Sequence, residues 1–230
     1  MAVKTEEKSL SEQIVEVMFL KRAFDDNPLT EKFLSERFKT SRTPIRDALK
    51  TLENDDLIER KKKKGVYLKR PAPKVISELY DLRIVLEGFA VRLACQNATE
   101  KDLKELEKAA KEFEKAQTAH DYVQSEHANV AFHQTIIKLS ANDMLIKMLN
   151  NMNIIRKAFQ YSYSLRPDRQ AIWSPYSHQD IILKLREKDV AGCEELIRNH
   201  IQIGKQRMIE QALGFKMNTM EAIVGTQTQD

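Results

Sequence analysis

From Val75 to about Phe215 the chain is patterned for helices throughout, and this long stretch limits the fold more than any other feature of the sequence. Apolar residues recur there at the three- and four-residue spacing that places them on one face of an α-helix. The chain holds only six glycines and six prolines among its 230 residues, so few positions interrupt such helices. We therefore predict a mostly α-helical protein, with a bundle of six or seven helices over residues 77–215.

The clearest domain boundary is the run Arg70-Pro71-Ala72-Pro73-Lys74. Two prolines within three residues favour extended chain, which is typical of a linker. We assign residues 1–70 to an N-terminal domain and residues 71–76 to the linker. Residues 216–230 are polar and weakly patterned, and we expect this tail to fray.

The N-terminal domain carries the signals of three helices followed by a hairpin. Ser9 and Thr30 are suited to cap the first two helices, and the third opens at Ser41. Two short segments, Leu57-Ile58-Glu59-Arg60 and Val66-Tyr67-Leu68, are predicted to be strands on either side of a lysine-rich turn. This order of elements predicts a winged helix-turn-helix whose wing is a small β-hairpin.

Positive charge is concentrated in the same part of the chain. Residues 32–70 hold 13 basic and 6 acidic side chains, a net charge of +7, whereas the whole chain carries +4. The remainder is therefore acidic, with a net charge of −3. Such an asymmetry favours contact between the N-terminal domain and the phosphates of nucleic acid.

The third helix has the composition of a DNA-reading helix. Its first turn offers Ser41, Arg42, Thr43 and Arg46, and the two arginines share a face opposite the apolar stripe. Guanidinium groups can grip a guanine edge or a phosphate, and the hydroxyls suit phosphate oxygens. Lys64, at the end of four consecutive lysines, would add positive charge at the tip of the wing. The alternative is a plain amphipathic helix beside a charged loop.

Three of the five histidines lie in apolar helical segments: His133, His178 and His200. Imidazole is a common ligand of first-row metals, but isolated histidines on apolar helices are more often core residues, so spacing leaves both roles open. His120 and His127 lie in a polar segment and are expected to face solvent. Cys95 and Cys193 match no metal or disulfide motif, which favours buried thiols in a reducing cytoplasm.

Residues 29–70 resemble the winged helix of GntR-family regulators, most clearly in the run Ser41-Arg42-Thr43-Pro44-Ile45-Arg46-Asp47-Ala48-Leu49. The resemblance extends to Leu34-Ser35-Glu36-Arg37-Phe38 and to Gly65-Val66. It implies a regulator that binds double-stranded operator DNA as a homodimer. Positions matching those that contact operator DNA in the family are Lys32, Ser41, Arg42, Thr43, Arg46 and Gly65.

Residues 77–210 resemble the C-terminal FCD domain of the FadR subfamily, through Leu82–Glu87, Phe132-His133 and Ser177-His178 followed 22 residues later by His200. In metal-binding members, three histidines and a carboxylate four residues before the first of them bind a divalent ion. His133, His178 and His200 match that set, and Asn129 stands where the carboxylate would be. The resemblance thus implies a site for Zn, Ni or Mn, weakened because an amide is a poorer donor than a carboxylate.

The resemblance further implies a repressor that responds to a small organic acid or sugar acid bound at or near the metal. We assign Arg83 and Asn142 as effector contacts, with an ion pair to Glu87 as the alternative role of Arg83. Three rival functions are a metal-dependent hydrolase, a DNA-binding protein with a metal-free effector pocket, and an architectural protein with an inert bundle. We do not expect an enzyme, because no Glu or Asp lies at a recognised catalytic spacing from the histidines. No run is long and apolar enough to cross a bilayer and no signal peptide is recognisable, so we expect a cytoplasmic protein.

Overall fold

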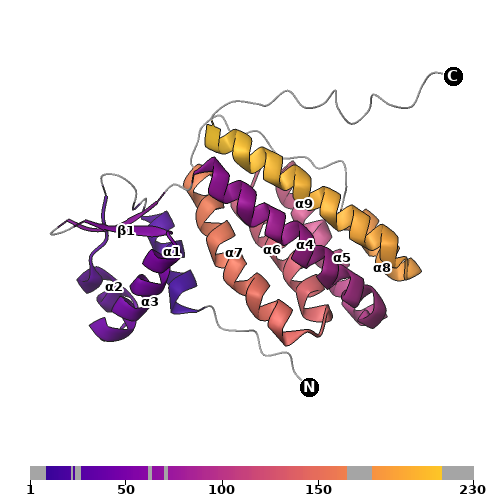
Figure 1. The fold of residues 1–230 in the computed structure, drawn as a ribbon, viewed down its shortest axis with the longest axis horizontal. Helices are drawn as coiled ribbons and strands as arrows, with labels where there is room; N and C mark the ends of the chain where they lie inside the picture. The colour runs from indigo at the N-terminus through magenta and orange to yellow at the C-terminus, as the bar shows by residue number, and fades with distance from the viewer. Residues whose placement is uncertain are drawn as a thin grey trace.

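The computed structural model describes residues 9–21, 23, 27–61, 64–69, 72–164 and 178–213. Within these ranges the chain forms a small N-terminal domain and, beside it, a helical bundle (Figure 1). The mostly helical fold predicted from the sequence is confirmed. The tail predicted at residues 216–230 lies outside the described residues.

The N-terminal domain is a winged helix-turn-helix, as predicted. Its elements are α1 (Leu10–Leu20), α2 (Glu31–Arg37), α3 (Arg42–Asn54), β1 (Ile58–Lys61) and β2 (Gly65–Leu68). Ser9 and Glu12 form a capping box at the start of α1, and the Thr30 hydroxyl accepts a hydrogen bond from the Phe33 amide at the start of α2. Since such caps satisfy amides that a helix start leaves unpaired, both helices begin where the sequence indicates.

The amphipathic pattern of α3 decides which of its faces is available to a ligand. Ile45, Leu49 and Leu52 are fully buried and belong to one core together with residues of α1 and α2. Arg42 and Arg46 are exposed on the opposite side. Burial of the apolar stripe therefore directs the basic side chains outward.

Gly65 sits where the wing meets the chain before α2. β1 and β2 pair antiparallel, with Gly65 opposite Lys61, and Leu29 forms an isolated bridge to Val66. The φ angle of Gly65 is +119°, and a Cβ there would lie 2.7 Å from the Leu29 carbonyl oxygen and 2.9 Å from the Cβ of Pro28. Only glycine fits this position without strain.

Replacing Gly65 with alanine should lower the free energy of unfolding of the N-terminal domain by about 2–4 kcal/mol, because backbone strain and steric overlap act together. In hydrogen-exchange mass spectrometry, the substitution should accelerate exchange more in β1 and β2 than in the bundle, relative to the wild type. Gly204→Ala is a suitable control, since a Cβ there meets the Tyr80 ring at an ordinary 3.4 Å. Equal effects of the two substitutions would contradict this explanation of Gly65.

The predicted linker is wrong in its extent. Pro73 is the first residue of α4 and Ala72 is its N-cap, so the bundle begins before residue 77. Proline is tolerated at a helix start because the amide that it lacks would be unpaired there in any case. The second of the two prolines thus starts a helix and does not prolong the linker.

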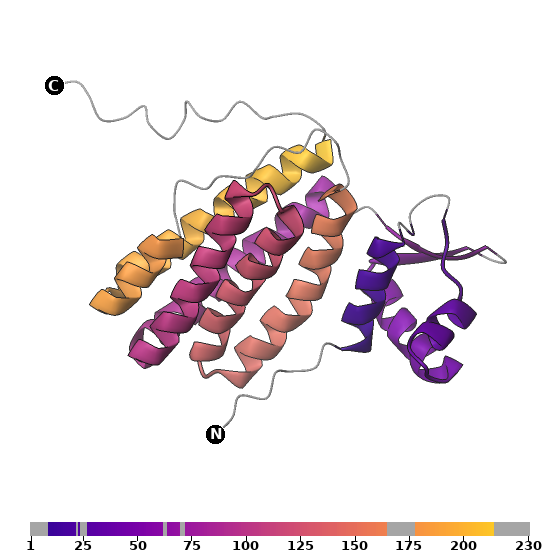
Figure 2. The same ribbon diagram turned by 180° about the vertical axis from the view of Figure 1, so that it is seen from behind.

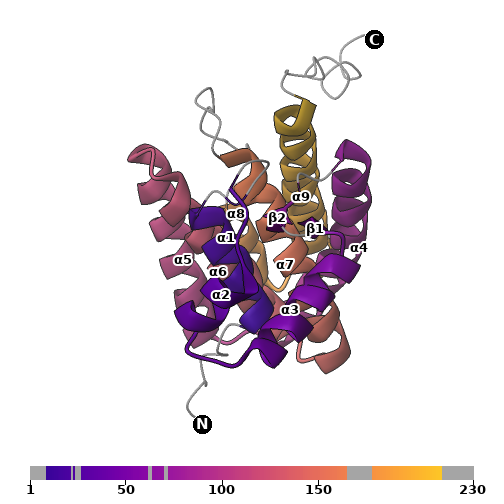
Figure 3. The same cartoon turned by 90° about the vertical axis from the view of Figure 1, so that its left-hand side faces the viewer.

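The bundle contains six helices among the described residues, within the predicted six or seven. They are α4 (Pro73–Asn97), α5 (Glu100–Thr118), α6 (Tyr122–Leu139), α7 (Asp143–Ser164), α8 (His178–Glu187) and α9 (Val190–Leu213). The long helices α4 and α9 lie along each other, and α5 lies along α6 (Figures 1 and 2). α7 contacts α4 and α6 on one side and α1 of the N-terminal domain on the other (Figures 1 and 2). Figure 3 views the molecule with the N-terminal domain in front of the bundle.

The expected surroundings of two histidines and of both cysteines are confirmed. His120 and His127 are exposed, and Cys95 and Cys193 are buried free thiols. None of the helices in the described ranges combines the length and apolar character that crossing a membrane requires.

Candidate functional site

The start of α3 presents an exposed polar surface. Ser41, Arg42 and Thr43 are all exposed, and Ser41 is the N-cap without a side-chain capping hydrogen bond. The first amides of a helix and a free hydroxyl are suited to phosphate oxygens. Here the structure places side chains of the right chemistry at the helix end that the sequence singled out.

Three further predicted DNA contacts lie on α2, on α3 itself and beside the wing. Lys32, on α2, is exposed and lies 3.9 Å from Glu36, and Lys64 is exposed beside β2. Arg46 is exposed but engaged, because its Nε donates to the Glu31 carboxylate at 2.8 Å. Contact of these residues with DNA stays a prediction.

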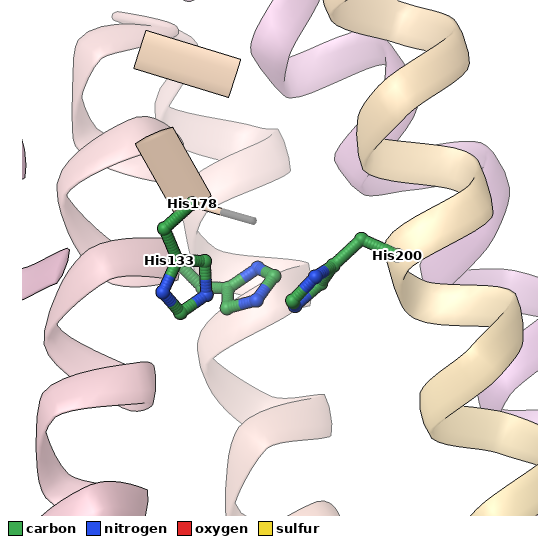
Figure 4. Close-up of side chains that lie close together, drawn as sticks. All are labelled: His133, His178 and His200. Atoms are coloured by element: carbon green, nitrogen blue, oxygen red, sulfur yellow. The ribbon is translucent and has the colours of Figure 1, made fainter. Parts of the chain in front are cut away.

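His133, His178 and His200 converge in the bundle although they come from three different helices. They extend from α6, α8 and α9, and their side chains point toward one another (Figure 4). Each residue offers a ring nitrogen, and these three atoms all lie within 4.8 Å of one another. His133 and His178 are buried and His200 is half-buried. Spacing in the sequence left this convergence open, and helix packing produces it.

Glu87 was not recognised as a site residue from the sequence. Its Oε2 lies 2.6 Å from Nδ1 of His133, and its Oε1 accepts a 2.7 Å hydrogen bond from Nε of Arg83. Burial alone would raise the pKa of Glu87, but the charges and hydrogen bonds of Arg83 and His133 hold it well below the usual value. Since an ionised carboxylate only accepts, Nδ1 of His133 is the donor, which leaves Nε2 to bind a ligand.

Within the described part of the chain, His178 packs against other rings. Its imidazole stacks on Phe132 at 4.1 Å between centroids and meets the edge of Phe113 at 4.7 Å. Among the described residues, neither ring nitrogen has a hydrogen-bond partner, although the residue is buried. The pKa of His178 lies well below its ordinary value. Burial is the largest cause, and the neighbouring His200 and His133 lower the pKa further. A neutral imidazole with buried, unpaired nitrogens fits a metal ligand.

The other residues predicted for the bundle site are Asn129, Arg83 and Asn142, and each has a different environment. Asn129 lies on α6 one turn before His133 and is half-buried, so its role as a ligand stays a prediction. Arg83 forms the ion pair with Glu87 that the sequence allowed as its alternative role. Asn142 caps α7, where its Oδ1 accepts a 3.1 Å hydrogen bond from the Leu145 amide. Neither arrangement tests an effector contact.

A second buried ion pair lies in the same bundle. Arg156 on α7 donates through Nη1 to Oε1 of Glu126 on α6 at 2.5 Å, and both residues are buried. Sequence reasoning missed it because the partners are 30 residues apart. A basic residue within the apolar pattern of α7 was the available signal, since a buried charge requires a partner.

A winged helix-turn-helix with an exposed basic helix, joined to a bundle that buries a histidine cluster, defines a DNA-binding protein with a regulatory domain. The model of bacterial regulatory proteins of the gntR family matches residues 24–68, and the model of the FCD domain matches residues 78–203. The second match alone covers more than half of the chain. The chain therefore belongs to the GntR family of transcriptional regulators, in the group with an FCD domain.

Individual relatives agree with this assignment. The chain is 27% identical to the Uxu operon regulator of Haemophilus influenzae, over 85% of this chain and 81% of that protein. It is 33% identical to the HTH-type transcriptional regulator YdhC of Bacillus subtilis, over 75% and 77% of the two chains. The solved structure of Escherichia coli McbR/YncC has the same fold, with a TM-score of 0.74, 23% identity, and coverage of 89% of this chain and 99% of that one.

These findings remove one rival function. The metal-dependent hydrolase considered from the sequence is not supported, because the family and the curated relatives are transcriptional regulators and not enzymes. The histidine cluster therefore lies in the FCD domain of a transcriptional regulator.

Proposed function

We propose that this protein is a repressor whose affinity for operator DNA is controlled by a small carboxylate bound at or near a divalent metal in the bundle. One observation carries the proposal: three histidine nitrogens lie within 4.8 Å of one another in a largely buried position. The two unpaired nitrogens of His178 add to it, because burying them without a partner costs free energy that a metal would offset.

In this proposal His133, His178 and His200 hold the ion, which is Zn, Ni or Mn, with Asn129 as a weak fourth donor. Glu87 orients His133 through the 2.6 Å contact to its Nδ1. Three neutral imidazoles and an amide leave the ion its full charge, which favours an anionic effector. A bound metal would supply an electrophilic anchor for one carboxylate oxygen.

Arg83 and Asn142 are the proposed polar contacts of the effector. Arg83 is buried and joined to His133 through Glu87, so its guanidinium belongs to the same polar network as the cluster. Asn142 has the weaker support, because its side-chain oxygen caps α7.

The route from effector to DNA runs through α7 in this proposal. α7 contacts α6, which carries His133, and also contacts α1 of the DNA-binding domain. A ligand that favours one position of α7 would change how the winged helices are presented, provided that it binds the two states with different affinity.

We propose further that the protein acts as a homodimer through the bundle. α4 and α7 pack side by side, and both expose large apolar side chains, which are Leu82, Val85 and Phe89 on α4 and Met144 and Met148 on α7. Exposed apolar surface on adjacent helices is typical of a protein interface. Two copies would read a two-fold operator, and sedimentation equilibrium showing only monomers would remove this part of the proposal.

Metal analysis tests the central claim. Protein purified without chelator should contain about one divalent ion per chain, and the variant His133→Ala/His178→Ala should contain almost none. His120→Ala/His127→Ala is the matched control, because both of these histidines are exposed, and it should keep its metal. Negligible metal in wild type and variant alike would refute the metal site and favour a metal-free effector pocket.

Asn129 can be tested within the same series. Asn129→Asp should tighten metal binding by about tenfold, since a carboxylate adds charge and a stronger oxygen donor. Competition with a fluorescent chelator would measure the change. An unchanged affinity would exclude Asn129 as a ligand while leaving the three histidines in place.

A further inference from the structure

Glu31 connects the DNA-reading helix to the wing. It is the first residue of α2, and its two oxygens contact two arginines from different elements. Oε2 lies 2.8 Å from Nε of Arg46 on α3, and Oε1 lies 3.0 Å from Nη1 of Arg60 on β1. Arg60 also lies 3.0 Å from Oε2 of Glu53 and donates to the backbone oxygen of Arg46 at 3.4 Å. The carboxylate is thus shared by the two parts of the domain expected to touch DNA.

The atom that Glu31 occupies determines what Arg46 can still do. A guanidinium has one Nε and two terminal nitrogens, and Glu31 receives the Nε–H. The side chain of Arg46 is still 60% exposed, whereas that of Glu31 is only 25% exposed. Glu31 thus leaves the two terminal nitrogens of an exposed side chain available, and they form the edge that binds a guanine or a phosphate with two parallel hydrogen bonds.

An acidic residue beside a DNA-binding arginine has an electrostatic cost. Phosphates repel it, so simple charge balance would favour a neutral side chain at this position. The contact between Glu31 and Arg46 offers a reason for an acid at this position. An unrestrained arginine loses several rotatable degrees of freedom when it binds, and an arginine already held by Glu31 loses fewer.

We propose that Glu31 is a positioning residue for sequence recognition, which orders Arg46 before DNA arrives and so favours the correct base sequence over others. The proposal rests on the assignment of Arg46 to the DNA interface. It assigns to Glu31 no contact with DNA of its own.

A simpler role for Glu31 makes different predictions. As an acid in the first turn of α2, it could merely stabilise the helix through the helix dipole. In that case its removal would lower the thermal stability and leave the preference for one DNA sequence unchanged. The effect of the Glu31 charge can also be distinguished from the positioning of Arg46. Loss of the negative charge alone should strengthen binding to every DNA sequence, whereas loss of positioning should weaken the preference for one sequence.

The test compares Glu31→Gln with Glu53→Gln on two DNA duplexes. One duplex is selected from a random library by the wild-type protein, and the other has the same composition in scrambled order. Glutamine cannot keep both contacts, because an amide NH2 group replaces one of the two oxygens and would face an arginine donor to donor. We expect Glu31→Gln to bind the scrambled duplex more tightly, while the ratio of selected to scrambled affinity falls about tenfold. Glu53→Gln removes the same charge and a contact to Arg60 but leaves the Arg46–Glu31 pair intact, so it should keep the ratio.

A coupling measurement guards against indirect effects. In the Arg46→Ala background, Glu31→Gln should no longer change the ratio, since the group that it positions is gone. An unchanged ratio for Glu31→Gln in the wild-type background would overturn the proposal, as would an equal fall in both backgrounds. If the wild-type protein selects no sequence from the library, the assignment of α3 as the DNA-reading helix fails instead.

Discussion

Replacing Arg42 and Arg46 together with alanine should abolish sequence-specific DNA binding and leave the bundle intact. Both side chains are exposed at the start of α3, on the face opposite the buried Ile45 and Leu49. A bidentate contact from arginine to a base contributes about 1–3 kcal/mol of discrimination, so losing two should reduce the specific affinity by about a hundredfold or more. Fluorescence anisotropy with the selected duplex, at several salt concentrations, would measure this loss.

Arg186→Ala/Arg198→Ala is the matched control, because it removes the same charge from the bundle. Arg186 and Arg198 are surface residues of α8 and α9 that pair with acidic neighbours. The control should bind the selected duplex nearly as well as the wild type, and both double variants should keep the metal. Full specificity in Arg42→Ala/Arg46→Ala would show that α3 does not read the DNA.

The second large effect is expected at His178, where function and stability oppose each other. His178→Phe should raise the free energy of unfolding of the chelator-treated protein by about 1–2 kcal/mol, because it removes two buried, unpaired nitrogens. The phenyl ring can keep the stacking on Phe132 and the edge contact to Phe113. The same variant should lose the stabilisation that added Zn gives the wild type, which reaches about 4 kcal/mol when free metal exceeds the dissociation constant a thousandfold.

Urea unfolding with and without Zn would measure both parts of this expectation. His127→Phe is the control, since His127 is exposed on α6 and lies outside the cluster. It should change neither the metal-free stability nor the response to Zn. A less stable His178→Phe protein that still responds fully to Zn would remove His178 from the proposed metal site.

The DNA-reading helix and the histidine cluster differ in how much of each could be predicted from the sequence. The DNA-reading helix could be identified from the sequence because its signals are local: a cap, a proline in the first turn, an apolar stripe and basic residues on the opposite face. The structure confirms the helix and the exposure of Arg42 and Arg46. It adds Glu31, whose contact with Arg46 spans 15 residues and has no periodic signal.

The histidine cluster shows the opposite case. The sequence placed His133, His178 and His200 on helices, and only the resemblance to a family suggested that they meet. Their convergence depends on how α6, α8 and α9 pack, since the three residues lie 22 or more positions apart. Glu87 illustrates the same limit, because its contact with His133 joins α4 to α6 across 46 residues.

The sequence by itself determined where the three helices of the N-terminal domain begin, which of their faces are apolar, where the strands of the wing lie, and where positive charge gathers. Those properties depend on neighbours within one or two helical turns. Tertiary structure alone decided that Glu87 contacts His133 and that Arg156 pairs with Glu126. These outcomes follow from burial, because a charged or polar group carried into the core must find its partner on whichever helix packs against it.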